Sequence, residues 1–307
     1  MADINRTTNS MALPSDISSE ILQKTQQESA IMRLARRIEL PGRGVTIPVI
    51  TGDPTAAWVA ETAVKPVSNG TPGTKLMKAF KIAVIETFSK EFTRDAAMLY
   101  DALIQRLPAA LGGVFDSTVI GATDRPDSTY FDWFASCQKQ SILNANNGTY
   151  LGIVAADADI AAHGGVMNGL AFGAAGRGLL LTATDTSNRP LFLASANDGV
   201  VDKVLGVPTY FNKNLYKAGT EAVGTTTPGV AAIVGVAGDW SQAMYGTVNG
   251  VEISVTDTAT LTVGTGTDAS TINLWQQNMV AVRAEIEVGF RANTECFNLL
   301  TGAIPTT

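Results

Sequence analysis

The sequence predicts an α+β fold in which one compact body carries extended arms. Apolar residues recur at helical spacing over 16–37 and 89–115, whereas they alternate strictly with polar residues over 280–290. A segment rich in Gly, Pro and Thr, residues 51–74, separates the two helical patterns. Together these patterns favour a mixed fold, and no fixed-period repeat is present.

Residues 16–37 are predicted to form an amphipathic helix that ends at Pro41-Gly42. Arg33, Arg36 and Arg37 would lie at its C-terminal end and form the compact basic patch of the chain. Cations near the C-terminus of a helix are favoured by the helix dipole, which accounts for the patch without a ligand. The alternative is contact with DNA or with a neighbouring molecule.

A long hairpin is predicted next, projecting from the body. Residues 43–50 read as an edge strand and residues 75–88 as the strand that returns. The segment 51–74 between them is longer than the irregular connections usual in compact domains, and it contains Trp58. A long irregular segment that carries a Trp is typical of an arm that contacts a partner.

The longest predicted helix follows this hairpin. Ser89 can cap it, and a stripe of apolar residues runs from Phe92 to Phe115. Pro108 removes one backbone hydrogen bond and is expected to bend the helix.

The middle of the chain, residues 126–235, is predicted to be a mixed α and β region. Its expected elements are helices at 128–143 and 157–167, strands at 178–182 and 204–211, and a Gly- and Thr-rich loop at 217–230.

Residues 280–290 are the clearest predicted strand. The alternation places Arg283, Glu285 and Glu287 together on the polar face. Two carboxylates on one face can carry out acid–base chemistry, but Arg283 can neutralise them in a solvated or intermolecular salt bridge. The structural interpretation is therefore favoured.

Composition and charge exclude several classes of protein. Only 16% of the residues are charged, against roughly 25% in ordinary soluble domains, so the chain is expected to bury outer surface against partners. The formal net charge of -6 argues against a dedicated DNA-binding protein, and any contact with DNA should lack sequence specificity. No run of 18 apolar residues suggests a membrane span.

The sequence predicts no metal, no cofactor and no catalytic residue. Cys137, Cys296 and the single His163 cannot complete a Cys/His zinc site, and the two thiols are expected to be buried and free. No Gly-x-Ser-x-Gly motif accompanies His163. Residues 264–269, Gly-Thr-Gly-Thr-Asp-Ala, resemble a dinucleotide-binding fingerprint, but too few residues follow to build the βαβ units that such a site needs.

The order of these segments resembles the major capsid proteins of tailed bacteriophages, which have the fold named for phage Hong Kong 97. The N-terminal helix and Val45-Thr46-Ile47-Pro48-Val49 resemble the N-arm of that family. Trp58-Val59-Ala60-Glu61 and Lys65-Pro66-Val67-Ser68 resemble its extended E-loop, and the helix after Ser89 resembles its spine helix. Segments 205–210, 238–241, 251–254 and 278–285 then follow in the order of the family.

The resemblance implies a division of the chain and a set of partners. The N-arm would span 1–44, the E-loop hairpin 45–87, the peripheral domain with its spine helix 88–127 and 236–290, and the axial domain 128–235 and 291–307. The chain would self-assemble into hexamers and pentamers of an icosahedral head that encloses double-stranded DNA. It would be assembled in the host cytoplasm with a separate scaffolding protein, a portal and, as an optional partner, a decoration protein, and it would be found in the virion. The candidate contacts between subunits are Trp58, Glu61, Lys65, Arg33, Arg36, Arg37, Arg283, Glu285 and Glu287.

Three other functions stay open on the sequence. An encapsulin-type nanocompartment has a similar fold but encloses protein cargo, so its particles would lack nuclease-protected DNA. A nucleotide-dependent enzyme would use the segment that begins at Gly264, and a cofactor titration would detect it. A surface adhesin would need an export signal, which the polar residues 1–10 are not expected to provide.

Overall fold

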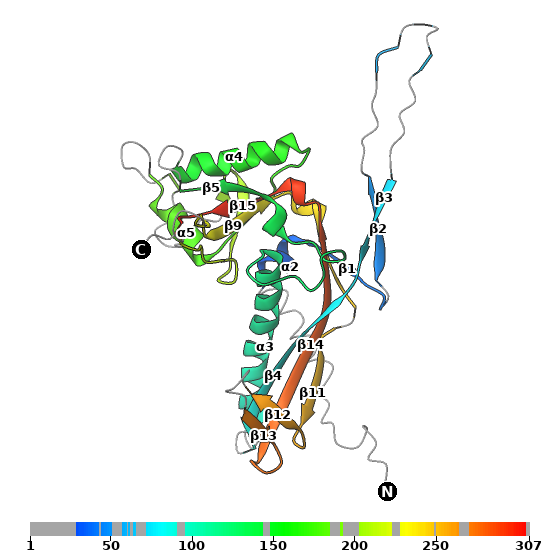
Figure 1. The fold of residues 1–307 in the computed structure, drawn as a ribbon, viewed down its shortest axis with the longest axis vertical. Coiled ribbons are helices and arrows are strands. Elements are labelled where there is room, and N and C mark those ends of the chain that lie inside the picture. The colour runs from blue at the N-terminus through cyan, green and yellow to red at the C-terminus, as the bar shows by residue number, and fades with distance from the viewer. Residues whose placement is uncertain are drawn as a thin grey trace.

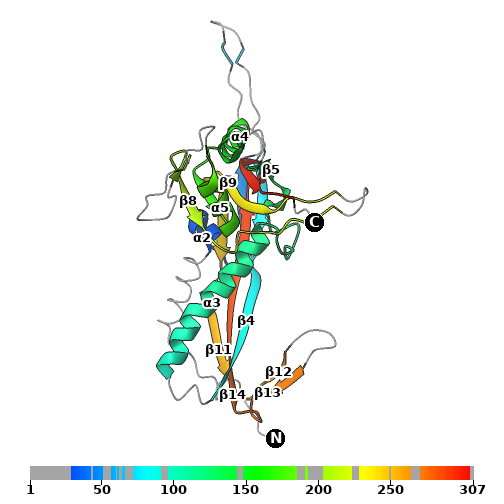
Figure 2. The same cartoon turned by 90° about the vertical axis from the view of Figure 1, so that its left-hand side faces the viewer.

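The structure is a computed structural model of the chain. It describes residues 29–42, 44–50, 57–59, 61, 64–65, 72–90, 96–143, 148–184, 191–192, 203–222, 228–248, 250–263 and 270–304. Two regions make up the body: one is built around a six-stranded sheet, and the other is an elongated layer of long strands beside helix α3 (Figures 1 and 2). A two-stranded arm leaves the body where these regions meet (Figure 1).

Strands outnumber helices among the described residues, which confirms the mixed α and β class. The helices are α2 (Ala30–Leu34), α3 (Ala96–Val119), α4 (Gly148–Ala162) and α5 (Ala174–Thr182), with short 3-10 turns η2 (Phe134–Ser136), η3 (Trp240–Gln242) and η5 (Thr294–Cys296). The strands are β1 (Arg36–Glu39), β2 (Val45–Ile50), β3 (Pro72–Met77), β4 (Phe80–Ser89), β5 (Gln138–Ser141), β6 (Gly169–Phe172), β7 (Lys203–Val204), β8 (Val207–Phe211), β9 (Ile233–Gly238), β10 (Ala243–Thr247), β11 (Glu252–Thr256), β12 (Thr260–Val263), β13 (Ser270–Asn273), β14 (Met279–Ala292) and β15 (Phe297–Thr301).

The long strand β14 organises the elongated layer. It pairs antiparallel with β4, β10 and β11, and β1 joins β10 in parallel. The predicted alternation is confirmed, because Val282, Ala284 and Ile286 are buried. Leu107 and Leu111 of α3 pack against this apolar face. Burial of each such side chain stabilises the fold by about 1.5 to 3 kcal/mol.

The second region is a six-stranded sheet in the order β5-β15-β9-β6-β8-β7. Every residue of β9 and β15 is buried, as expected for central strands covered on both faces. Helices α4 and α5 share one core with this sheet, in which Ile153, Ile160 and Leu180 pack near Phe172.

An aromatic cluster joins the two regions. The ring of Phe134 lies 5.5 Å from that of Phe290 on β14 and stacks 4.6 Å from that of Phe297 on β15. Trp240 crosses Phe297 at 5.2 Å, and its indole N–H donates a 3.0 Å hydrogen bond to the carbonyl of Gly169. Each such aromatic pair contributes about 0.5 to 1.5 kcal/mol beyond its area burial, so the cluster couples the two sheets.

The predicted helix over 16–37 is wrong at its C-terminal end. Helix α2 ends at Leu34, and residues 36–39 form strand β1, whose backbone pairs with β10 from Arg36 opposite Met244 to Glu39 opposite Thr247. Sheet pairing with a distant segment overrides the local helical pattern here. The part of the prediction that covers 16–28 lies outside the described residues.

The hairpin strands are confirmed, but the start of the long helix is wrong. The return strand is divided into β3 and β4, and Ser89 ends β4 opposite Met279 instead of capping a helix. Helix α3 then continues through Pro108 to Val119.

Two predictions in the middle of the chain are wrong, and a third is shifted along the sequence. Residues 128–143 form turns and strand β5, not a helix, because β5 pairs with the distant β15. The helix expected at 157–167 is α4, which begins at Gly148 and ends at Ala162. Residues 178–182 belong to α5, since a short apolar run fits a buried strand and a helix equally well. The strand expected at 204–211 is confirmed as β7 and β8.

Candidate functional site

The arm consists of β2 and β3, which pair antiparallel from Val45 opposite Met77 to Ile50 opposite Pro72. Figure 1 shows it rising away from both regions of the body, with the described segments 57–59 and 64–65 at its far end. Trp58 is 105% exposed and Val64 is 95% exposed. A Trp offers 150–250 Å² of surface for burial, so its full exposure leaves a large apolar area in water.

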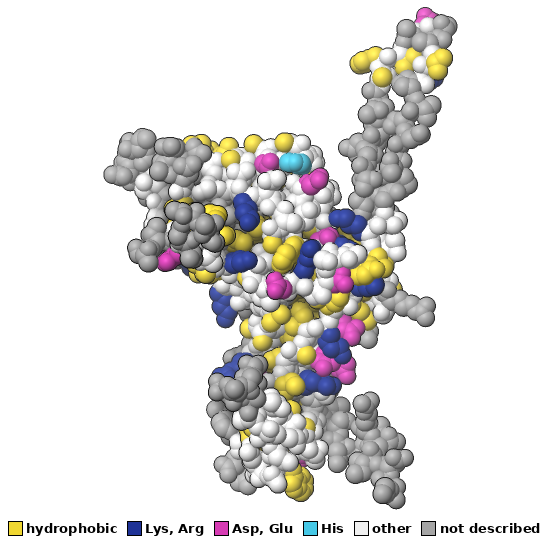
Figure 3. Space-filling view, viewed as in Figure 1, with side chains coloured by type: hydrophobic (Ala, Val, Ile, Leu, Met, Phe, Trp, Pro, Cys, Tyr) yellow, Lys and Arg dark blue, Asp and Glu magenta, His cyan; other side chains and the backbone are white. Residues whose placement is uncertain are grey.

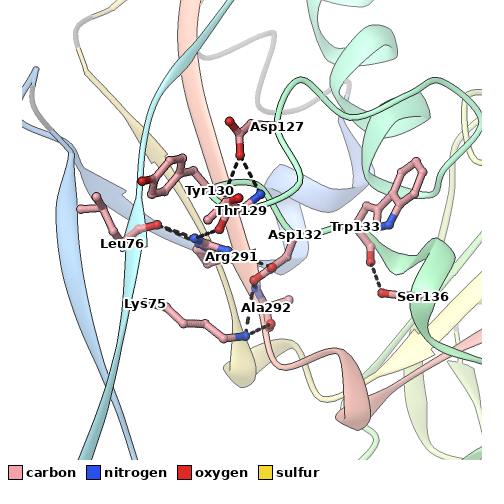
Figure 4. A network of polar contacts seen from close by, with 10 residues as sticks. All are labelled: Lys75, Leu76, Asp127, Thr129, Tyr130, Asp132, Trp133, Ser136, Arg291 and Ala292. Atoms are coloured by element: carbon pink, nitrogen blue, oxygen red, sulfur yellow. Dashed lines mark hydrogen bonds and ion pairs between the residues drawn. The ribbon is translucent and has the colours of Figure 1, made fainter.

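The root of the arm is fixed by Arg291, which lies on β14 and is only 7% exposed (Figure 4). Its Nη2 donates 2.5 Å hydrogen bonds to the carbonyls of Leu76 on β3 and of Thr129. Its Nη1 donates to Oδ1 of Asp132 at 2.9 Å, and its Nε donates to the Leu76 carbonyl at 3.0 Å. One planar guanidinium therefore ties the arm, the loop after α3 and the long sheet together.

Lys75 and Asp132 complete this network. Nζ of Lys75 lies 3.6 Å from Oδ2 of Asp132 and donates a 3.5 Å hydrogen bond to the carbonyl of Ala292. The backbone N–H of Ala292 donates to the same carboxylate at 3.2 Å. Two cations and one amide thus surround a carboxylate that is mostly withdrawn from water, where such bonds are stronger than at the surface.

The loop that presents the Thr129 carbonyl is itself held in shape. Asp127 accepts hydrogen bonds from the backbone N–H groups of Thr129 at 2.6 Å and Tyr130 at 2.9 Å, and these bonds lower the pKa of its carboxyl group. Nζ of Lys78 lies 3.5 Å from the ring centre of Tyr130, a cation–π contact. These contacts hold the loop in place beside the arm root.

Gly44 directly precedes strand β2 of the arm and has a backbone conformation that favours glycine. Its φ of +87° lies in the left-handed region, and a side chain there would collide with the carbonyl of Met77. Met77 is fully buried at the other strand of the root.

A second polar cluster lies on the exposed face of β14 and β4. Nζ of Lys81 donates a 2.8 Å hydrogen bond to Glu285, which also lies 3.2 Å from Nε of Arg283. Glu287 is 3.8 Å from Lys81. The hydrogen bond to Glu285 raises the pKa of Lys81, and the same bond lowers the pKa of Glu285. The predicted grouping of Arg283, Glu285 and Glu287 is confirmed, and Lys81 is the partner that the sequence did not indicate.

The sequence of the chain matches a known protein family over most of its length. Residues 9–295 match the sequence model of the family described as the phage capsid family. The chain belongs to the phage capsid family.

Several capsid proteins and solved structures resemble the chain over most of its length. A probable major capsid protein of Mycobacterium phage L5 is 29% identical over 296 residues, which cover 90% of this chain and 84% of the relative. The major capsid protein of Staphylococcus phage 80alpha is 23% identical over 297 residues, with 95% and 85% covered. A solved structure from Mycobacterium phage Adephagia superposes with a TM-score of 0.68 at 21% identity and 92% coverage of both chains. The capsid of a native GTA particle gives a TM-score of 0.59 at 12% identity, with 99% of this chain and 96% of the other covered.

The structure of this capsid-family chain separates the predicted contact residues into groups. Trp58, Glu61 and Lys65 are all exposed and belong to the segment of the chain between β2 and β3, whereas the other candidates lie on α2, β1 and β14. Arg33 is in the last turn of α2, where its guanidinium lies 4.9 Å from the ring centre of Tyr210.

The prediction that Arg33, Arg36 and Arg37 lie together at the end of one helix is therefore wrong. Arg36 and Arg37 are exposed on strand β1, not on the helix, so the helix dipole accounts only for Arg33.

Cys137, Cys296 and His163, the residues considered for metal binding or catalysis, make contacts typical of residues with a structural role. Cys137 and Cys296 are free and buried, as predicted, and burial raises the pKa of both thiols. His163 follows the end of α4, and its Nδ1 lies 2.8 Å from the carbonyl of Asp159. Residues 264–269 lie outside the described part of the chain. Among the residues that the structure does describe, no group of three or more His, Cys, Asp or Glu is arranged to hold a metal ion.

No helix within the described ranges combines the length and the apolar character needed to cross a membrane.

Sequence reasoning missed Arg291 and Asp132. The available signal was weak: Arg291 continues the polar phase of β14 one residue beyond the predicted end of the strand. Its partners Leu76 and Thr129 are 215 and 162 residues away in the chain. No local pattern could have joined them.

Proposed function

We propose that copies of this chain assemble into the hexamers and pentamers of an icosahedral phage head that encloses double-stranded DNA. As a phage capsid protein, the chain is a structural component of the virion head. The observation that carries the proposal is the exposed apolar end of the arm, where Trp58 and Val64 are 105% and 95% exposed.

A desolvated pocket on another copy would cover this surface. Trp is enriched among the residues that dominate interface energies, and its few rotatable bonds keep the entropic cost of ordering it low. An arm of one copy that reaches a different surface on the next copy forms a heterologous contact, and such contacts close into rings when the rotation permits. Repeated around a ring, this contact would produce a capsomer.

The proposal assigns a role to each part of the chain. The arm corresponds to the E-loop at 45–87, and residues 1–44 form the N-arm. Helix α3 corresponds to the spine helix of a peripheral domain at 88–127 and 236–290, and the six-stranded sheet belongs to an axial domain at 128–235 and 291–307. Within this division β4 pairs with β14 from Phe80 to Ser89, so the projecting part of the E-loop includes β2, β3 and the described segments 57–59 and 64–65.

Other molecules of the head complete the proposal. Assembly in the host cytoplasm would use a separate scaffolding protein and a portal, and a decoration protein could be added outside. The formal net charge of -6 supports enclosure of DNA without sequence-specific binding. A structural role without enzymatic activity is in keeping with the relatives that are named as capsid proteins.

Negative-stain electron microscopy and sedimentation of the purified chain, with and without its scaffolding protein, test this function. We expect capsomers or irregular shells from the chain alone and uniform closed shells with the scaffold. Particles from infected cells should contain nuclease-protected DNA, whereas a nanocompartment would contain protein cargo. A chain that stays monomeric under all of these conditions would contradict the proposal.

A further inference from the structure

Helix α4 carries exposed apolar side chains on its outer side, next to exposed Asp157, as well as buried apolar side chains on its inner side. Ile153, Ala156 and Ile160 are buried against the six-stranded sheet. On the opposite side Leu151 is 48% exposed, and Tyr150 and Val154 are also exposed. A surface helix normally presents a polar face to water, and one that is apolar all round is normally covered on all sides.

The exposed side of α4 lies at an edge of the body. Figures 1 and 2 both place α4 at the top of the six-stranded region, on the side toward which the arm rises. Apolar side chains follow this edge in the space-filling view (Figure 3). Exposed Leu143 before the helix and exposed Val166 after it extend the apolar character beyond the helix ends.

The charged residues of this edge, within residues 140–176, are negative. Residues 140–176 contain no Lys or Arg, and they include Asp157, which is exposed, and Asp159, which is half-buried. A partner that covers the edge should therefore carry apolar side chains together with positive charge.

The region of α5, β7 and β8 has this complementary character. Leu181 and Leu205 are exposed large apolar residues, and Arg177, Lys203 and Lys213 are exposed cations. The described residues in 174–184 and 203–217 include no Asp or Glu. Helix α5 lies below α4 in both ribbon views, so the two surfaces are separate parts of one molecule (Figures 1 and 2).

We propose that the outer side of α4 in one copy docks on the α5 and β7–β8 surface of a second copy. This inference rests on the proposed assembly function and names the surfaces that meet within a ring. Because one chain carries both halves of the contact, it can repeat from copy to copy. The arm rises on the α4 side, so the arm and α4 would approach the same neighbour.

A pair of introduced cysteines tests the contact. Leu151→Cys on α4 and Leu205→Cys at the β7–β8 turn would be combined in one chain, and assembled particles would be oxidised mildly. Cys137 and Cys296 are buried, so background cross-linking should be small. We expect a ladder of covalent multimers on a non-reducing denaturing gel from the double variant and none from either single variant.

A charge reversal provides a second readout. Asp157→Lys places a cation opposite Arg177, Lys203 and Lys213, and we expect the yield of particles to fall about tenfold or more. Lys203→Asp in the same chain should restore part of that yield. The melting temperature of unassembled subunits should be unchanged in both variants, because Asp157 and Lys203 are exposed.

The outcomes separate this inference from the proposed function. Closed shells from the cysteine variant without a multimer ladder would overturn the α4 contact and leave the assembly function intact. Normal assembly of Asp157→Lys would do the same, and would point to an external protein or to solvent on α4. A wild-type chain that forms no particle would overturn both.

Discussion

The hydroxyl of Ser29 donates a 2.5 Å hydrogen bond to Oδ1 of Asp116 inside the protein, where both residues are fully buried. Asp116 lies on α3 and also accepts bonds from the backbone N–H groups of Ala30 at 3.1 Å and Ile31 at 3.4 Å. Nδ2 of Asn212 donates a fourth bond at 3.2 Å. This one carboxylate therefore sets the position of α2 against the long helix and against the segment after β8.

The stability of the subunit should depend on pH through Asp116. Burial raises its pKa to about 7, and the hydrogen bonds from Ser29, Ala30 and Ile31 only partly oppose that rise. Because the folded-state pKa is above the unfolded value of 3.8, the contribution is fully present below about pH 4 and is lost as the pH rises through about 7. We expect the free energy of unfolding to increase, by no more than a few kcal/mol, between pH 7.5 and about pH 5.

Urea unfolding of unassembled subunits at a series of pH values measures this effect. The matched control is Asp116→Asn, which cannot ionise and should show a flatter profile between pH 5 and about pH 7.5. Parallel profiles for the wild type and Asp116→Asn would show that Asp116 does not titrate in this range.

The arm root should depend on the shape of the Arg291 side chain and not only on its charge. Arg291→Lys keeps the charge, but one ammonium cannot reach the carbonyls of Leu76 and Thr129 and the carboxylate of Asp132 in the same geometry. We expect a loss of about 1 to 3 kcal/mol of subunit stability, because the charge is kept but partly buried carbonyl oxygens lose their donors. Hydrogen exchange should also accelerate in β3.

Arg283→Lys is the control for this substitution. Arg283 is exposed, so the same exchange of side chains should change stability by less than about 1 kcal/mol. Equal losses of stability in Arg291→Lys and Arg283→Lys would show that the hydrogen bonds of Arg291 at the arm root do not stabilise the subunit.

Trp58→Ala should weaken assembly without affecting the folding of the subunit. Trp58 is 105% exposed, so its truncation removes no packing within the chain. A Trp set in a pocket on a neighbour is worth about 2 to 4 kcal/mol per contact, and a closed shell repeats that contact. Calorimetry of free subunits and the yield of shells per folded subunit measure the two effects separately. A lower melting temperature with a normal shell yield would show that Trp58 belongs to the core of its own subunit.

Gly238→Ala should destabilise the junction between the two sheets. A Cβ at Gly238 would overlap the ring of Phe297 within the aromatic cluster, and overpacking of this kind typically costs about 1 to 3 kcal/mol. Gly178→Ala in α5 is the matched control, since nothing lies near the position its Cβ would take, and it should stabilise the helix by up to about 1 kcal/mol. Denaturant midpoints of the two variants should therefore move in opposite directions.

The sequence by itself determined the features that depend on local periodicity and composition. The alternation that ends at Phe290 fixed the buried face of β14, because successive side chains of a strand point to opposite sides. The turn-rich segment with Trp58 between two strand-like runs indicated an arm, since so few apolar residues cannot pack a core of their own. Both features need only residues that are close together in the chain.

Only the tertiary structure decided the features that depend on distant partners. Residues 36–39 became a strand because β10, more than 200 residues away, supplies hydrogen bonds to their backbone. Arg291 became the centre of the arm root because the fold places the carbonyls of Leu76 and Thr129 around it. Asp116 lies on α3 just after the apolar stripe that predicted this helix, but its raised pKa follows from burial that the local pattern does not reveal. Periodicity reports which face of an element is buried, whereas hydrogen-bond partners and local dielectric are set by which elements the chain brings together.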